Sequence, residues 1–81
     1  MNPTQSLTDR VEKKMDMISV HSSAISAIGY DVNTRQLGIK FHNNPIVYTF
    51  YNVPFQVYNE LMASPSKGFY YHQHIEGNYR G

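Results

Sequence analysis

The groups best suited to chemistry in this chain lie in a proline-broken turn and in the aromatic segment that follows it. The turn reads Ser64-Pro65-Ser66-Lys67-Gly68, and the rings of Phe69 and Tyr70 come directly after it. Backbone N–H groups at a helix start, together with a lysine ammonium group, suit a phosphate or a carboxylate, and aromatic rings stack on bases. The turn therefore predicts an anion site at Ser66 and Lys67. The alternative is that Ser66 caps a helix while Phe69 and Tyr70 fill the core.

Two further hydroxyl groups, those of Ser22 and Ser23, directly precede a predicted strand. Serines in such a place most often form turns or caps. The functional interpretation is that these two serines join Ser66 and Lys67 in holding an oxyanion.

The chain holds more aromatic rings than a small core accommodates, with seven tyrosines, four phenylalanines and no tryptophan. Exposed amphipathic rings serve as protein interfaces or as platforms for bases; the alternative is that the rings pack and only their hydroxyl groups reach water. Arg80 is a candidate to clamp a phosphate or stack on a base, and Lys40 becomes relevant if its face of the sheet lines a groove between subunits. The candidates for exposed ligand-binding rings are Tyr51, Tyr70, Tyr71 and Tyr79.

Catalysis is not predicted. The chain contains no cysteine, no G-x-S-x-G nucleophile elbow and no Walker loop. The carboxylates beyond residue 16 lack the paired spacing of a general acid and base. His72 and His74 are two positions apart, and on a helix such residues do not face each other. We therefore expect no catalytic residue, no metal site and no cofactor.

The charge balance argues against a long nucleic-acid partner. Seven Lys and Arg against six Asp and Glu give a formal net charge of +1. A protein that binds a duplex carries a clustered excess of basic residues, so we expect no DNA duplex as partner. The basic residues present are enough to bind one or two phosphates per subunit. Beyond residue 16 the charged residues are Arg35, Lys40, Lys67 and Arg80 against Asp31, Glu60 and Glu76.

Length and composition predict one cytoplasmic domain. The chain has 81 residues, of which 41% are hydrophobic, and this suits a single folded unit. No stretch approaches the roughly 20 apolar residues that span a bilayer, and the polar N-terminus differs from a secretory signal, so no membrane partner is expected. Because a small core without disulfides is marginally stable, we expect a homo-oligomer.

The hydrophobic pattern predicts a small α+β domain. Alternation indicates three antiparallel strands, which form a meander. Pro54 and Pro65 bound one short C-terminal helix, and a second follows it. A stripe of Leu7, Val11 and Met15 predicts an extra N-terminal helix, which makes residues 1–16 an extension and 17–81 the domain. The strands are expected within 24–31, at 37–41 and at 46–51, and the second helix over about 66–74. The two apolar faces of the third strand indicate that both are covered, or that the strand is central with a partner packed outside.

Several short motifs, together with this order of elements, are typical of one small family. They are Val20-His21-Ser22-Ser23-Ala24-Ile25, Ile28-Gly29-Tyr30-Asp31, Tyr48-Thr49-Phe50-Tyr51, Asn52-Val53-Pro54 and Ser64-Pro65-Ser66-Lys67-Gly68, with Ile75 and Tyr79 in the tail. They resemble the KTSC domain, a family named for an appendage at the C-terminus of some lysyl-tRNA synthetases, over about residues 17–80. The chain departs from the family at Tyr48-Thr49-Phe50, where a second tyrosine is usual. The resemblance implies the same fold, and it implies RNA binding as one function.

Low charge, many aromatic rings and a serine–lysine turn together favour a non-catalytic binder of a small phosphate-bearing nucleotide. We expect it to work as a homo-oligomer, and in a phage, as stand-alone relatives imply, to sequester a cyclic nucleotide immune signal in the host cytoplasm. The alternatives are an RNA-binding accessory module, as the synthetase appendage implies, and a protein–protein interaction domain that uses its aromatic residues as a contact patch.

Overall fold

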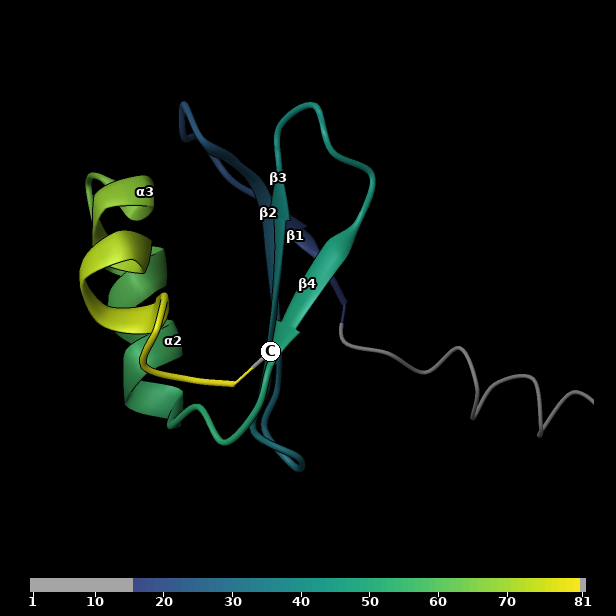
Figure 1. Cartoon of the computed structure of the whole chain (residues 1–81), viewed down its shortest axis with the longest axis vertical. Coiled ribbons are helices and arrows are strands. Elements are labelled where there is room, and N and C mark those ends of the chain that lie inside the picture. The colour runs from purple at the N-terminus through teal and green to yellow at the C-terminus, as the bar shows by residue number, and fades with distance from the viewer. Residues whose placement is uncertain (1–15, 81) are drawn as a thin grey trace, which may run out of the picture.

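The computed structural model describes residues 16–80 of the chain as one antiparallel sheet with helices on one of its faces (Figure 1). The four strands lie in the order β1-β2-β3-β4. Consecutive strands therefore pair as neighbours, which is the predicted meander with one strand more. The elements are β1 (Ile18–Ser19), β2 (Ile25–Asp31), β3 (Gln36–Phe41), β4 (Val47–Phe50), α2 (Phe55–Ala63), α3 (Lys67–Tyr70) and a π-helical turn, η1 (Tyr71–Ile75).

Alternation along β2 and β3 directs one set of side chains toward the helices. Leu37 and Ile39 are fully buried, whereas the next residue, Lys40, belongs to the opposite face of the sheet. Ile28 pairs with Ile39, and a register shift between Ile25 and Ala27 marks a bulge. In a regular strand two residues three positions apart lie on opposite faces. Because the bulge adds a residue, Ile25 and Ile28 are both buried on the same face.

Prolines determine where the helices lie, as the sequence predicts. Pro54 occupies the N-cap of α2 in an extended conformation, and α2 ends before Pro65. The next helix starts at Lys67 and widens into η1, in which Glu76 N–H donates to Tyr71 O at 2.9 Å. This wider turn places both Tyr71 and Ile75 in the core.

The core lies between the sheet and the helices. Nine residues form it, and the partly buried rings of Tyr30 and Tyr58 stack at its border with centroids 4.9 Å apart. No helix within residues 16–80 has the length and apolar character needed to cross a membrane. The core residues are Ile25, Ile28, Leu37, Ile39, Phe50, Val53, Leu61, Tyr71 and Ile75.

The fold corrects the prediction at two places and leaves a third outside the described residues. There are four strands rather than three, because Ile18–Ser19 forms a two-residue strand too short to show alternation. The expectation that the third predicted strand is covered on both faces is wrong within residues 16–80. That strand is the edge strand β4, and its Val47 and Tyr48 are 39% and 42% exposed. The predicted N-terminal helix falls on residues 1–15, which are not described.

Candidate functional site

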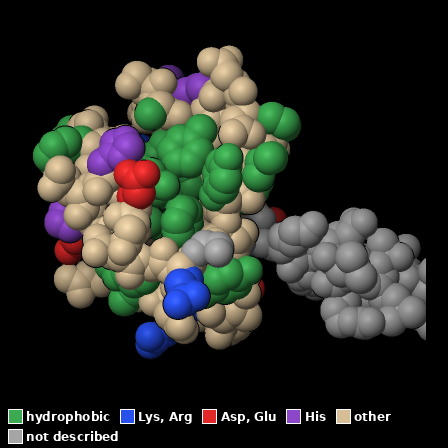
Figure 2. Space-filling model, viewed as in Figure 1, with side chains coloured by type: hydrophobic (Ala, Val, Ile, Leu, Met, Phe, Trp, Pro, Cys, Tyr) green, Lys and Arg blue, Asp and Glu red, His purple; other side chains and the backbone are tan. Residues whose placement is uncertain are grey.

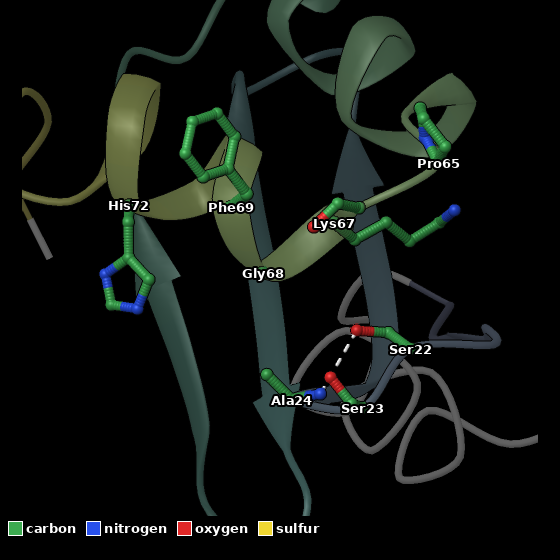
Figure 3. Close-up of a pocket in the computed structure, with 9 residues that line it drawn as sticks. Ser22, Ser23, Ala24, Pro65, Lys67, Gly68, Phe69 and His72 are labelled. Atoms are coloured by element: carbon green, nitrogen blue, oxygen red, sulfur yellow. Dashed lines mark hydrogen bonds between the residues drawn. The ribbon is translucent and has the colours of Figure 1, made fainter.

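A cavity of about 310 Å³ lies between the loop that precedes β2 and the start of α3. Figure 3 shows the two segments facing each other across it, with Ser22 and Ser23 on one side and Lys67 on the other. The structure thus brings together the four residues that the sequence suggested as an oxyanion site. The lining consists of Ser22, Ser23, Ala24, Pro65, Ser66, Lys67, Gly68, Phe69 and His72.

The loop of Ser22 and Ser23 that precedes β2, called the serine loop, is held in place by its own hydrogen bonds and by His42. The Ser22 hydroxyl oxygen accepts from the backbone N–H groups of Ala24 and Ile25, both at 3.2 Å. His42 Nε2 lies 2.9 Å from Ser22 O, and His42 N–H donates to Ala24 O at 3.0 Å. Ser22 therefore forms the turn that its residue type predicts. Ser23, the next residue, is exposed.

The opposite side is organised by Ser64 rather than by Ser66. The Ser64 hydroxyl accepts from Ser66 N–H at 3.1 Å and donates to Ser66 O at 2.9 Å. Ser66 stands at the N-cap of α3, yet its side chain makes no capping hydrogen bond, so the interpretation of Ser66 as a side-chain cap is wrong. Its exposed hydroxyl lies at the cavity instead.

Lys67 is partly tied to the same turn. Its Nζ donates to Ser64 O at 2.9 Å, and Figure 3 shows its side chain running past the turn, away from His72. An ammonium group has three N–H donors, so two remain beyond the bond to Ser64 O. The carbonyl bond limits the freedom of the long side chain and thus the entropy that a ligand must remove.

Glycine at position 68 permits the close approach of the two sides. A Cβ atom on Gly68 would lie 3.2 Å from the Cβ of Ala24. Since real Cβ contacts are rarely that short, a larger side chain would push α3 away from the serine loop.

Tyr71 corrects the prediction of an exposed ligand-binding ring. It is only 9% exposed and packs edge-on against Phe41 and Phe50, with centroid distances of 5.2 and 5.9 Å. Burial, with a smaller effect of the Glu76 charge, raises the pKa of Tyr71. Its ring is therefore a core element whose edge reaches the surface.

Tyr70 lies at a surface contact between two helices. Its hydroxyl donates to Glu60 Oε1 at 2.8 Å, and its ring lies 4.4 Å from that of His74. Burial and the hydrogen bond to Glu60 raise the pKa of Tyr70 to about 12. The same bond, followed by one from Gln56, lowers the pKa of Glu60 below its ordinary 4.5. Tyr70 thus joins α3 to α2 and does not line the cavity.

Replacing Tyr70 with phenylalanine is expected to lower the melting temperature by a few degrees near neutral pH and to make that deficit pH-dependent. Because the folded state depresses the pKa of Glu60, the stabilisation exists above its ordinary 4.5 and is lost as the pH falls through the lowered value. Thermal melts of both proteins from pH 7 to pH 3 check this. A deficit that stays constant down to pH 3 would contradict the role of the bond.

The remaining predicted residues lie away from the cavity. Lys40 faces the side of the sheet opposite the helices. Tyr51, 47% exposed, follows β4, and its N–H donates to Arg80 O at 2.8 Å. Tyr79 is half-buried and packs on the core. The structure therefore does not join Lys40, Tyr51, Tyr79 and Arg80 to the serines and Lys67.

Two residues that line the cavity, Phe69 and His72, are not among the predicted ligand-binding residues. Phe69 is 64% exposed, and His72 Nδ1 contacts Glu76 Oε1 at 2.5 Å. The four-residue spacing of His72 and Glu76 is the signal that could have indicated this pair. Within residues 16–80 no group of three or more His, Cys, Asp and Glu residues could hold a metal ion.

Comparison with known proteins identifies the fold that carries this cavity. The KTSC domain family model matches residues 21–79, a range that includes both sides of the cavity. The chain belongs to the KTSC domain family. As a KTSC domain it is similar to a lysine–tRNA ligase of Nostoc sp., with 34% identity over 64 residues. The match covers 79% of this chain but only 11% of that ligase.

Other KTSC relatives stand alone. A protein of Tsukamurella paurometabola is 34% identical over 64 residues, covering 79% of this chain and 94% of the relative. The crystal structure of a KTSC domain protein from Yersinia pestis superposes with a TM-score of 0.78 at 33% identity, over 83% of this chain and 93% of that one. The domain thus occurs both as a small part of a ligase and as nearly a whole protein.

Proposed function

We propose that this KTSC domain is a non-catalytic binder of a small phosphate-bearing nucleotide. The observation that carries the proposal is the cavity in which Ser22, Ser23, Ser66 and Lys67 converge. Hydroxyl groups and an ammonium group are donors that suit phosphate oxygens, and hydrogen bonds to charged groups are the stronger ones. No acidic residue lines this cavity, so nothing in its lining repels an anion.

The size and charge of the site support a small ligand over a polymer. The cavity of about 310 Å³ is within the range of small-molecule sites. The formal charge of +1 is small for a protein that follows a long phosphate backbone. Lys67 is the basic residue in the lining, which matches one phosphate per subunit.

We include oligomerisation in the proposal. The edge strand β4 has a partner on one side, and Ile46 and Val47 at its start are 55% and 39% exposed. Association through this region would cover apolar surface that the single chain leaves in water. A two-fold dimer would supply two cavities for the two phosphates of a cyclic dinucleotide. Sequestration of a cyclic nucleotide immune signal, as by a phage-encoded protein, is the physiological form of this proposal.

RNA binding is the second candidate, because a lysine–tRNA ligase contains a related segment. In that case several phosphates would be neutralised, and the affinity for RNA would fall steeply with salt. A third candidate, a protein–protein contact through the exposed rings, predicts no nucleotide affinity.

Titration calorimetry with GMP, guanosine and inorganic phosphate tests the proposal. We expect GMP to bind and guanosine, which lacks the phosphate, to bind at least tenfold more weakly, since charged hydrogen bonds contribute about 1.5–3 kcal/mol each. Equal affinity for GMP and guanosine, or no binding of any of the three probes, would overturn the proposed phosphate site.

A further inference from the structure

The first cavity is called the serine–lysine cavity after Ser22, Ser23, Ser66 and Lys67. A second hollow adjoins it and has a different chemical character. It measures about 500 Å³ and shares Ala24 and His72 with the first cavity. Figure 2 shows hydrophobic side chains gathered between the helices and β4, with a histidine and an acidic side chain beside them. The lining consists of Ala24, Phe41, His42, Asn43, Asn44, Tyr48, Tyr71, His72 and Glu76; we call it the aromatic hollow.

Three rings give the aromatic hollow a preformed wall. Phe41 packs edge-on against Tyr48 and against Tyr71, with centroid distances of 5.7 and 5.2 Å. Asn44 Nδ2 donates to the Tyr48 hydroxyl at 3.1 Å, which fixes the ring at the surface. Tyr48 nevertheless remains 42% exposed. A ring held in place with a free face is a stacking platform for a planar base.

Among the polar residues that line the aromatic hollow, Glu76 supplies the carboxylate, beside the amides of Asn43 and Asn44. Glu76 contacts His72 Nδ1 through Oε1, and a carboxylate oxygen has capacity for further donors. A carboxylate accepts but does not donate, so it selects a base edge that carries N–H groups. Guanine presents two adjacent N–H donors on its pairing edge, which match the two oxygens of a carboxylate.

We propose that the aromatic hollow is the base subsite of the nucleotide and that it favours guanine. This inference rests on the proposed function, because the phosphate of the same ligand occupies the serine–lysine cavity. Because Ala24 and His72 line both hollows, one ligand can span them. Its base then stacks on Tyr48 with its edge at Glu76, and its sugar lies near His72. The contact between His72 Nδ1 and Glu76 leaves Nε2 of His72 for the sugar or the phosphate.

The test compares calorimetric affinities for GMP, AMP and ribose 5-phosphate. We expect GMP to bind at least tenfold more tightly than ribose 5-phosphate, because stacking contributes about 1–3 kcal/mol per base. Tyr48→Ala should weaken GMP binding about tenfold and leave ribose 5-phosphate unchanged. Glu76→Gln should remove the preference for GMP over AMP, since the amide offers only one acceptor oxygen.

Tyr51→Ala is the matched control, because Tyr51 is similarly exposed, at 47% against 42% for Tyr48, but does not line the aromatic hollow. It should leave all three affinities unchanged, and thermal melts show whether each variant is folded. Equal affinities for GMP and ribose 5-phosphate would overturn the base subsite while the phosphate site stands. Absence of binding by both probes would overturn the proposed function, and the subsite with it.

Discussion

Replacing Tyr71 with alanine is expected to lower the free energy of unfolding by about 3–5 kcal/mol, the usual cost of removing a buried aromatic ring. The Tyr71 side chain is 9% exposed and packs against Phe41 and Phe50, at the contact between η1 and the sheet. A domain of 81 residues has a total stability of the same order. Much of the variant should therefore be unfolded, as urea denaturation followed by circular dichroism would show.

Tyr71→Phe separates the ring from its hydroxyl group. Because phenylalanine keeps the packing, this variant should lose less than about 1.5 kcal/mol, which is the scale of one hydrogen bond. If Tyr71→Ala unfolds at the same urea concentration as the natural chain, the ring is not part of the core. If Tyr71→Phe is as unstable as Tyr71→Ala, the hydroxyl group and not the ring carries the effect.

Replacing Lys67 with alanine is expected to weaken nucleotide binding about 10- to 100-fold, which corresponds to one or two charged hydrogen bonds. The variant removes the ammonium group from the serine–lysine cavity, together with its bond to Ser64 O. Because that bond lies at a surface turn, stability should change little. Calorimetry with GMP gives the affinity, and a thermal melt gives the stability.

Lys40→Ala is the matched control for Lys67→Ala. It removes the same charge from the other face of the sheet, outside the lining of the cavity. If binding depended only on net charge, the two variants would weaken it equally, whereas a defined site requires a large effect of Lys67 alone. An equal loss in both variants would contradict the placement of the phosphate.

The sequence predicts the framework well where local patterns determine it. Alternation at Leu37 and Ile39 indicates a strand with one buried face, and the prolines at 54 and 65 bound α2. It misses β1, because two residues carry no period, and β1 exists only through pairing with Ala27 and Ile28. The prediction of an exposed Tyr71 is wrong because it rests on the number of aromatic rings and not on their helical spacing. Four positions before the buried Ile75, Tyr71 shares its face of the helix.

The candidate site could be predicted only in part. The residue types of Ser66 and Lys67 indicate an anion site, and the structure places Ser22 and Ser23 across from them. This meeting depends on the long-range approach of Gly68 to Ala24, which no local pattern reveals. For the same reason the sequence did not show that Lys40 and Arg80 lie elsewhere, or that Phe69 and His72 line the cavity.

Native mass spectrometry of the natural chain, mixed with cyclic di-GMP and a short RNA, tests the central claim most directly. It reports the number of subunits and the bound mass in one experiment. The proposed function predicts an oligomer that retains intact cyclic di-GMP at a fixed ratio and leaves the RNA unbound. A monomer that retains only the RNA would contradict it, and hydrolysed cyclic di-GMP would show an enzyme in place of a binder.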